Sequence, residues 1–143
     1  MKHLREPKEK DEWAAYYDLR YRILRQPWNQ PPSSAFTPED DTAKHFALYE
    51  NTMLVAIARL DELDKTSAQV RFFAVDETYQ GKGYGKTLIQ GIEDYCSQNQ
   101  ITRLILEARE NAIPFYASQG YTITKEGKLL FDKIRHSWMI KNL

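Results

Sequence analysis

Residues 70–89 read VRFFAVDETYQGKGYGKTLI, and the rest of the chain is arranged around this stretch. Its first six residues have the composition of a strand, in which Val70, Phe72 and Ala74 are expected to share one face. A helix is predicted over its last part and beyond, because apolar residues recur there at helical spacing; they are Leu88, Ile89, Ile92, Tyr95 and Cys96. The sequence therefore predicts a strand, a glycine-rich turn and a helix in succession.

The turn comprises residues 80–86, QGKGYGK, in which glycine occupies every second position. Glycine at these positions lets the backbone turn sharply and direct several N–H groups toward one point. The helix that follows adds its own free N–H groups and the positive end of its dipole. Lys82 and Lys86 add full positive charges. We expect this turn to bind a ligand that carries phosphate groups.

The spacing of the glycines distinguishes between phosphate-binding motifs. A Walker loop requires a glycine where Gln80 stands, and a Rossmann motif does not have the even spacing of Gly81, Gly83 and Gly85. The pattern that fits is Gln-x-x-Gly-x-Gly, entered from a strand that ends at residues 73–75. This pattern resembles the acetyl-CoA motif of the GNAT superfamily of N-acetyltransferases. A glycine-rich turn that binds no ligand is the alternative interpretation.

The resemblance implies a fold, a co-substrate and a set of binding residues. Acetyl-CoA would be the co-substrate, held by the backbone of the turn and of the preceding strand. The backbone N–H groups at the end of that strand would also stabilise the oxyanion that forms during acyl transfer. The residues that the resemblance assigns to binding are Phe73, Ala74, Val75, Gln80, Gly81, Lys82, Gly83, Tyr84, Gly85 and Lys86.

A second stretch, residues 107–121, reads EARENAIPFYASQGY and is similar to the second signature of the same superfamily. Carried over to this chain, the resemblance implies that Asn111 holds the pantetheine arm and that Tyr116 lies beside the CoA sulfur. A thiolate leaves when an amine attacks a thioester, and a phenol within hydrogen-bond distance can protonate it. Tyr116 is therefore the candidate general acid. The alternative is that it is an aromatic residue of the core.

Transfer to an amine also requires a base, because an amine with a pKa of about 10 is protonated at neutral pH. The candidates are Glu107 at a predicted strand end, Asp76, His45 and His136. Glu107 and His45 rank first. Residues 40–44, which precede His45, are similar to a stretch of the ElaA-like branch of the superfamily. A structural role is the alternative for each histidine.

Composition sets the limits of these interpretations. The 143 residues predict one domain, 1–143, with enough chain to bury a core. Twenty basic and twenty acidic residues cancel, so no nucleic-acid footprint is seen, and the apolar run at residues 53–58 is too short to span a membrane. The N-terminus lacks the apolar core of a signal peptide. A single cysteine, Cys96, excludes an internal disulfide and a cysteine metal cluster. We expect a cytoplasmic protein without a metal, a nucleic-acid partner or a membrane partner.

The remaining elements are predicted from periodicity and turn residues. In chain order we expect an edge strand at 2–6, a helix from Asp11 to about Arg25, an irregular segment at 26–43, strands at 44–50 and 53–60, a strand at 101–107, a short helix capped by Asn111 and closed by Gly120, and a last hairpin of strands 121–124 and 131–141 around a turn at 125–128. This order predicts an α/β fold with a largely antiparallel sheet. It resembles the GNAT topology from end to end. Only the long segment 26–43 departs from it, and its aromatic residues Trp28 and Phe36 suggest that it docks on the domain, facing the acceptor.

The predicted function is an N-acetyltransferase that moves the acetyl group of acetyl-CoA directly to a primary amine of a small molecule or a protein. A covalent intermediate on Cys96 is not expected, because this residue lies on the apolar stripe of its helix. A non-catalytic acyl-CoA-binding module is the second hypothesis, and a P-loop nucleotide hydrolase is the third. The identity of the acceptor stays open, as does the choice between a monomer and a homodimer.

Overall fold

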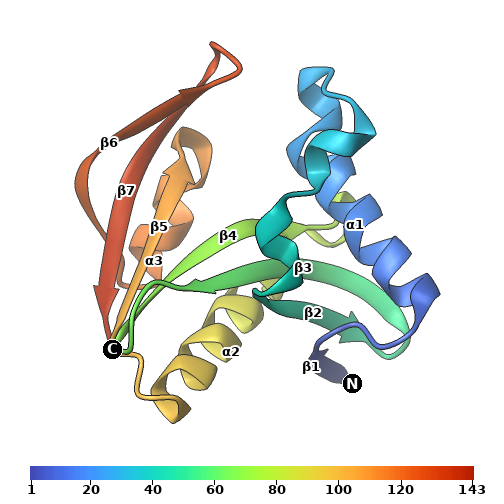
Figure 1. The fold of residues 1–143 in the computed structure, drawn as a ribbon, viewed down its shortest axis with the longest axis horizontal. Helices are drawn as coiled ribbons and strands as arrows, with labels where there is room; N and C mark the ends of the chain where they lie inside the picture. The colour runs from blue at the N-terminus through green and yellow to red at the C-terminus, as the bar shows by residue number, and fades with distance from the viewer.

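One sheet of seven strands organises the computed structural model, which describes all 143 residues (Figure 1). The elements in chain order are β1 (Lys2–Arg5), α1 (Lys10–Leu24), β2 (Lys44–Glu50), β3 (Met53–Glu62), β4 (Ser67–Val75), α2 (Tyr84–Gln98), β5 (Arg103–Arg109), α3 (Ile113–Ser118), β6 (Thr122–Leu130) and β7 (Ile134–Asn142). The strand order is β1-β2-β3-β4-β5-β7-β6, and only β4 and β5 pair in parallel. The predicted α/β class with a largely antiparallel sheet is confirmed.

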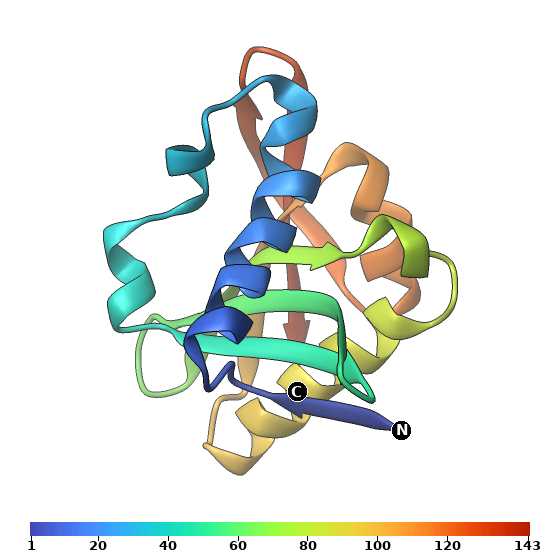
Figure 2. The same cartoon turned by 90° about the vertical axis from the view of Figure 1, so that its right-hand side faces the viewer.

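Helices cover both faces of the sheet, with α1 on one face and α2 on the other (Figure 2). Strand β2 shows how the sequence produces this arrangement. Ala47 and Tyr49 pack with α1, whereas Phe46 and Leu48 pack with the buried stripe of α2. Successive side chains of a strand point to opposite faces, so a strand buried on both sides is apolar at every position. No helix of the structure is both long enough and apolar enough to cross a membrane.

The central strand β4 does not keep the simple alternation that its sequence predicts. Val70 packs on the α2 side, but Phe72 and Ala74 pack on the α1 side, so the prediction that all three share a face is wrong. The cause is a β-bulge: the pairing with β3 shifts between Ile57 and Arg59. Phe72 lies within the bulge at a φ of 53°, a left-handed conformation that is strained for a residue with a side chain.

Beyond the bulge, β4 and β5 separate. Their pairing extends only from Ser67 to Val70 on β4 and from Arg103 to Leu106 on β5. Residues 71–75 therefore keep β3 as a partner on one edge and face a gap on the other. The sheet is consequently split between β4 and β5, and the split is visible in Figure 1 as two diverging halves.

The last hairpin is longer than predicted. Strand β6 continues through residues 125–128, so the turn predicted there is wrong, and the chain reverses at Phe131 and Asp132, which have φ values of 54° and 56°. Gly127 has a different function. A Cβ at Gly127 would collide with the carboxylate of Glu107, so this glycine permits β6 to approach the end of β5 closely.

The segment 26–43 forms three short 3₁₀ turns, Gln26–Trp28, Pro32–Ala35 and Pro38–Asp41. It docks through Asp40, whose carboxylate lies 3.0 Å from Nη1 of Arg20 and 2.9 Å from Nη1 of Arg59. Both guanidinium groups are fully buried. Phe36, by contrast, is 54% exposed. Its ring nevertheless packs against Tyr17 of α1, with 4.5 Å between the ring centroids, so buried ion pairs and an aromatic contact together hold this segment in place.

Candidate functional site

The turn between β4 and α2 has unused backbone donors. None of the N–H groups of residues 80–86 donates a hydrogen bond to another backbone group. The first N–H group of α2 that has a backbone acceptor is that of Thr87, which donates to the carbonyl oxygen of Gly83. Gly81 and Gly83 have φ values of 76° and 88°, a region that glycine enters without strain. Lys82 and Lys86 lie on the same turn and are exposed. Free N–H groups and two cations at a helix start form a suitable site for phosphate groups.

The third glycine of the turn has a packing role. A Cβ at Gly85 would stand 3.3 Å from the Cζ atom of Phe115 and 3.7 Å from Val75. Around Gly81 and Gly83, in contrast, no atom lies within 4 Å of such a Cβ. Gly85 therefore lets the first turn of α2 pack against α3, while the other two glycines shape the exposed turn.

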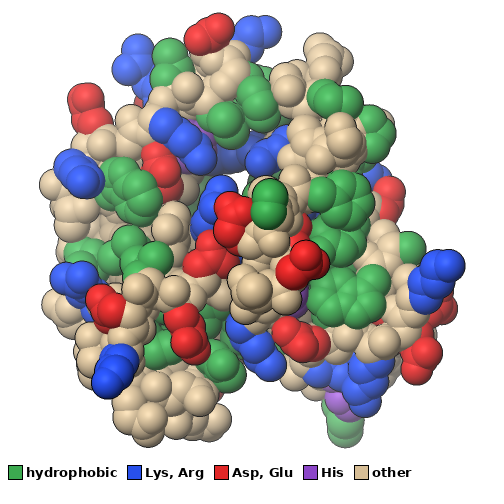
Figure 3. Space-filling model, in the orientation of Figure 1, with side chains coloured by type: hydrophobic (Ala, Val, Ile, Leu, Met, Phe, Trp, Pro, Cys, Tyr) green, Lys and Arg blue, Asp and Glu red, His purple; other side chains and the backbone are tan.

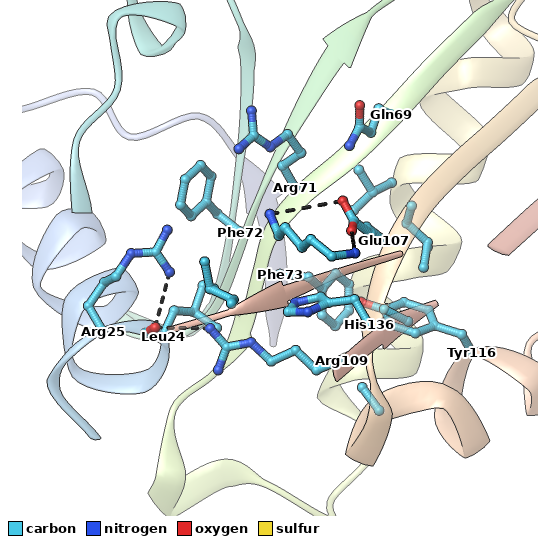
Figure 4. Close-up of a pocket in the computed structure, with 16 residues that line it drawn as sticks. Leu24, Arg25, Gln69, Arg71, Phe72, Phe73, Glu107, Arg109, Tyr116 and His136 are labelled. Atoms are coloured by element: carbon cyan, nitrogen blue, oxygen red, sulfur yellow. Dashed lines mark hydrogen bonds and ion pairs between the residues drawn. The ribbon is translucent and has the colours of Figure 1, made fainter. Parts of the chain in front are cut away.

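A cavity of about 170 Å³ occupies the gap between β4 and β5 (Figure 4). Its wall is formed by the end of α1, by β4 and β5, by α3 and by the last hairpin. The residues that line it include Leu24, Arg25, Gln69, Arg71, Phe72, Phe73, Glu107, Ala108, Arg109, Tyr116, Lys128, Leu130 and His136. Four sequence-predicted residues thus meet in one cavity: Phe73, Glu107, Tyr116 and His136.

Tyr116 lies on the cavity wall and is 6% exposed. Its ring is held by edge contacts with Phe73 at 5.7 Å and Tyr121 at 5.9 Å between centroids. Burial raises the pKa of Tyr116 well above its ordinary value. The phenol therefore stays protonated at neutral pH, which is the state that a proton donor requires.

The backbone of β4 directs N–H groups into the gap. The N–H of Asp76 donates to the carbonyl oxygen of Val55 on β3 at 2.8 Å. Because successive N–H groups of a strand point to alternate edges, those of Val75 and Phe73 face the opposite edge, where β5 has separated. Two backbone donors with no partner strand at a cavity can stabilise a developing negative charge.

Two of the candidate bases, Glu107 and His136, share this cavity. The carboxylate of Glu107 accepts a hydrogen bond from the backbone N–H of Lys128 at 2.6 Å, and it lies 3.9 Å from the Lys128 ammonium. His136 is 8% exposed, and its Nδ1 lies 3.0 Å from the carbonyl oxygen of Ile134. A carbonyl only accepts, so Nδ1 carries the proton and Nε2 keeps a lone pair. Burial lowers the pKa of His136, which favours this neutral form.

Three of the residues predicted from the sequence lie elsewhere. His45 is buried away from the cavity, with Nδ1 2.8 Å from the hydroxyl of Tyr16 and Nε2 2.8 Å from the carbonyl oxygen of Asp40. Asp76 forms an ion pair with Arg22 and caps a 3₁₀ turn. Asn111 is exposed in the 3₁₀ turn Glu110–Ala112, and the N-cap of α3 is Ala112, so the prediction that Asn111 caps this helix is wrong.

Sequence reasoning missed the basic side chains of the cavity, which are Arg25, Arg71, Arg109 and Lys128. Figure 3 shows a hollow on this face with Lys and Arg side chains along its upper part. A signal was present for two of them, since Arg71 interrupts and Arg109 ends a strand that is otherwise largely apolar. The convergence of Arg25 and Lys128 with them follows only from the tertiary structure.

Comparison with known proteins shows which family has this sequence pattern and this architecture. A family model described as the acetyltransferase (GNAT) family matches residues 13–121. YjcF of Bacillus subtilis (strain 168), an uncharacterized N-acetyltransferase, is 23% identical over 128 residues, which cover 90% of each chain. The solved structure of Escherichia coli ElaA has a TM-score of 0.83 at 19% identity and covers 99% of each chain. A GNAT family acetyltransferase from Elizabethkingia anophelis, solved with acetyl-CoA bound, has a TM-score of 0.78 at 14% identity over 100% of this chain and 97% of that one.

Proposed function

The chain belongs to the acetyltransferase (GNAT) family, and on this premise we propose that it transfers the acetyl group of acetyl-CoA directly to a primary amine. The observation that carries the proposal is the gap between β4 and β5. Beside it lies a turn whose backbone N–H groups are free, and a protonated phenol, Tyr116, stands on its wall. The relative that holds acetyl-CoA supports the choice of ligand.

In this proposal the free N–H groups of residues 80–86 bind the pyrophosphate of acetyl-CoA, with Lys82 and Lys86 adding charge. Asn111, exposed beside the gap-forming end of β5, would contact the pantetheine arm. Binding of the remote nucleotide and pantetheine portions would position the thioester in the cavity, which supplies the orientation that an acyl transfer needs.

The chemistry then requires an oxyanion site and a proton donor. When the amine attacks the thioester carbon, the carbonyl oxygen gains negative charge, and the N–H groups of Phe73 and Val75 would stabilise it. Collapse of the tetrahedral intermediate breaks the carbon–sulfur bond, and Tyr116 would protonate the departing thiolate. Cys96 takes no part, because it is fully buried on the inner face of α2 and burial raises its pKa to about 12.

His136 is the base that the geometry favours. Its Nε2 is free to accept a proton from the amine, while the carboxylate of Glu107 is held by Lys128 and His45 lies outside the cavity. The base must be neutral to act, and the pKa of His136 is lowered from 6.5. We therefore expect kcat/KM to fall as the pH drops through a pKa below 6.5. An unchanged acid limb in His136→Gln would assign the base to another group, with Glu107 the next candidate.

One pair of measurements separates the proposal from its rivals. Calorimetric titration of the protein with acetyl-CoA and with ATP should show binding of acetyl-CoA alone. Mass spectrometry of a mixture of primary amines, incubated with the protein and acetyl-CoA, should then detect an acetylated product. Binding without a product would favour a non-catalytic acyl-CoA-binding module, and binding of ATP would favour a nucleotide hydrolase.

A further inference from the structure

The cavity contains more positive than negative charge. Four cationic side chains line it, Arg25, Arg71, Arg109 and Lys128, and they come from four different elements or their ends. The single carboxylate among the lining residues is Glu107, and its ion-pair partner is Lys128. The three arginines are thus left without a carboxylate inside the cavity, although all of them are partly withdrawn from water.

Arg25 and Arg109 form the centre of this charge (Figure 4). Both donate to the same carbonyl oxygen, that of Leu24, at 3.1 Å and 2.9 Å, and Arg25 also donates to the carbonyl oxygen of Ser34. Neither forms an ion pair with any acidic residue of the chain. A guanidinium has five N–H donors, so each group keeps donors that no protein acceptor uses. Burial, and then the charge of Arg25, lower the pKa of Arg109 to about 10.

Capping of α1 does not account for this arrangement. Leu24 is the last residue of α1, and a cation near the carbonyl groups of a helix end is stabilising. One arginine is enough for that role, however, and a second one next to it adds repulsion between like charges. Capping does not involve Arg71 and Lys128, which lie on β4 and β6 and pair with Asp61 and Glu107, each at 3.9 Å, so the unpaired cations are Arg25 and Arg109. Desolvated cations without partners are costly, and an anionic ligand would offset that cost.

We propose that the acceptor is a small primary amine that carries an acidic group, a carboxylate or a phosphate, and that Arg25 and Arg109 bind this group. The inference rests on the proposed acetyl transfer and specifies its substrate class. The planar fork of a guanidinium matches both acidic groups with paired hydrogen bonds. The cavity of about 170 Å³ is smaller than the roughly 300–1,000 Å³ of pockets for drug-sized ligands, which favours an amine of amino-acid size. The same cations disfavour polyamines.

Matched pairs of amines test the proposal in the full-length protein. With saturating acetyl-CoA, release of the CoA thiol is measured for β-alanine against β-alaninamide, glycine against glycinamide, and phosphoethanolamine against ethanolamine, with spermidine as a polycation. We expect the acidic member of at least one pair to have a kcat/KM about ten- to a hundredfold higher, the range for a hydrogen bond to a charged group. The first two pairs report on a carboxylate and the third on a phosphate. Equal values within every pair, or a preference for spermidine, would overturn the inference.

Variants connect the preference to the two arginines. Arg109→Gln and Arg25→Gln should each raise KM for the acidic amine by about tenfold or more and leave the KM of its neutral partner nearly unchanged. Arg103→Gln is the matched control, because Arg103 lies at the opposite end of β5, is exposed and forms no ion pair. Two independent arginine variants are used so that a folding defect in one of them does not decide the result. Retention of the preference in both would also overturn the inference.

A binding measurement separates this inference from the proposed function. N-acetyl-β-alanine and its neutral counterpart, N-acetyl-β-alaninamide, are titrated calorimetrically into the protein in the absence of CoA. Selective binding of the acid, lost in Arg109→Gln, is expected even if acetyl-CoA were not the donor. If acetyl-CoA binds and neutral amines are acetylated but no acidic ligand is preferred, the proposed transfer stands and the inference fails. If acetyl-CoA does not bind while the acid does, the reverse holds.

Discussion

Replacement of Tyr116 by phenylalanine isolates one hydroxyl group of the cavity. The ring of Tyr116 is held by Phe73 and Tyr121, and these edge contacts do not involve the hydroxyl. Burial and the nearby charge of Arg109 govern its pKa, and no hydrogen bond contributes. Removing the oxygen therefore breaks no interaction within the chain. We expect the free energy of unfolding to change by less than about 1 kcal/mol.

The effect on catalysis should be much larger than the effect on stability. A general acid typically contributes about 10² to 10⁴ in rate, which corresponds to roughly 2.7–5.5 kcal/mol of transition-state stabilisation. In Tyr116→Phe, kcat should fall within that range. The affinity for acetyl-CoA should stay nearly constant, because the turn that we propose to bind its phosphates lies at residues 80–86, on a different part of the molecule.

Tyr121→Phe provides the matched control. This neighbouring tyrosine is also buried, but its hydroxyl donates to the carboxylate of Glu93 at 2.9 Å, away from the cavity. Loss of a hydrogen bond to a charged group costs about 1.5–3 kcal/mol, or roughly 5–10 °C in Tm for a domain of this size. The two variants should therefore show opposite behaviour, with Tyr121→Phe losing stability and Tyr116→Phe losing kcat.

The assay is thiol release from acetyl-CoA with one identified amine, supported by calorimetric binding of acetyl-CoA and by thermal unfolding of both variants. If kcat of Tyr116→Phe stays within about twofold of wild type, well below the range for general acids, the hydroxyl does not protonate the thiolate. Tyr116 is then an aromatic residue of the core, as its contacts with Phe73 and Tyr121 would also allow.

Three further predictions concern the phosphate-binding turn and the docked segment. Lys86→Glu should weaken acetyl-CoA binding by about ten- to thirtyfold and leave Tm unchanged, since each unit charge at about 4 Å in water is worth roughly 1 kcal/mol. Equal affinity of the variant and the wild type by calorimetry would exclude a role of this lysine in binding. Gly83→Val should abolish binding with the circular dichroism spectrum preserved, whereas Gly120→Val, at a similar φ of 94° but at the end of α3, should cost only stability. Asp40→Ala should destabilise the fold by about 3–5 kcal/mol, because it leaves the buried guanidinium group of Arg20 without an ion-pair partner and removes one of the two carboxylates that pair with buried Arg59. Burial alone would raise the pKa of Asp40, but hydrogen bonds from Thr37 and Arg59 and the charge of Arg20 lower it overall. The stability that Asp40 contributes is therefore present above about pH 4 and is lost as the pH falls through the lowered pKa. If the stability of the wild type does not decline faster in acid than that of Asp40→Ala, this pH dependence is contradicted.

Local chemistry determined the parts of this protein that could be predicted from the sequence. The turn at residues 80–86 depends on glycines and a helix start that are adjacent in the chain, so its free N–H groups follow from local backbone preferences. The order of elements likewise follows from periodicity, and the family from motifs within residues 13–121. The predicted burial of Cys96 was confirmed for the same reason, since one apolar stripe placed it against the sheet.

Contacts between distant segments decided the rest. The bulge at Phe72 reversed the faces of β4 because its cost is offset by packing against α1, which no pattern within β4 encodes. The residues around Gly127 predicted a turn, yet the absence of a side chain at Gly127 makes room for the carboxylate of Glu107, twenty residues earlier in the chain. The meeting of Arg25 with Arg109 depends on where the end of α1 lies beside the separated strands. Local propensity determines which element a residue belongs to. The charge and shape of the cavity depend on side chains from α1, β4, β5, α3, β6 and β7, which only the packed fold brings together.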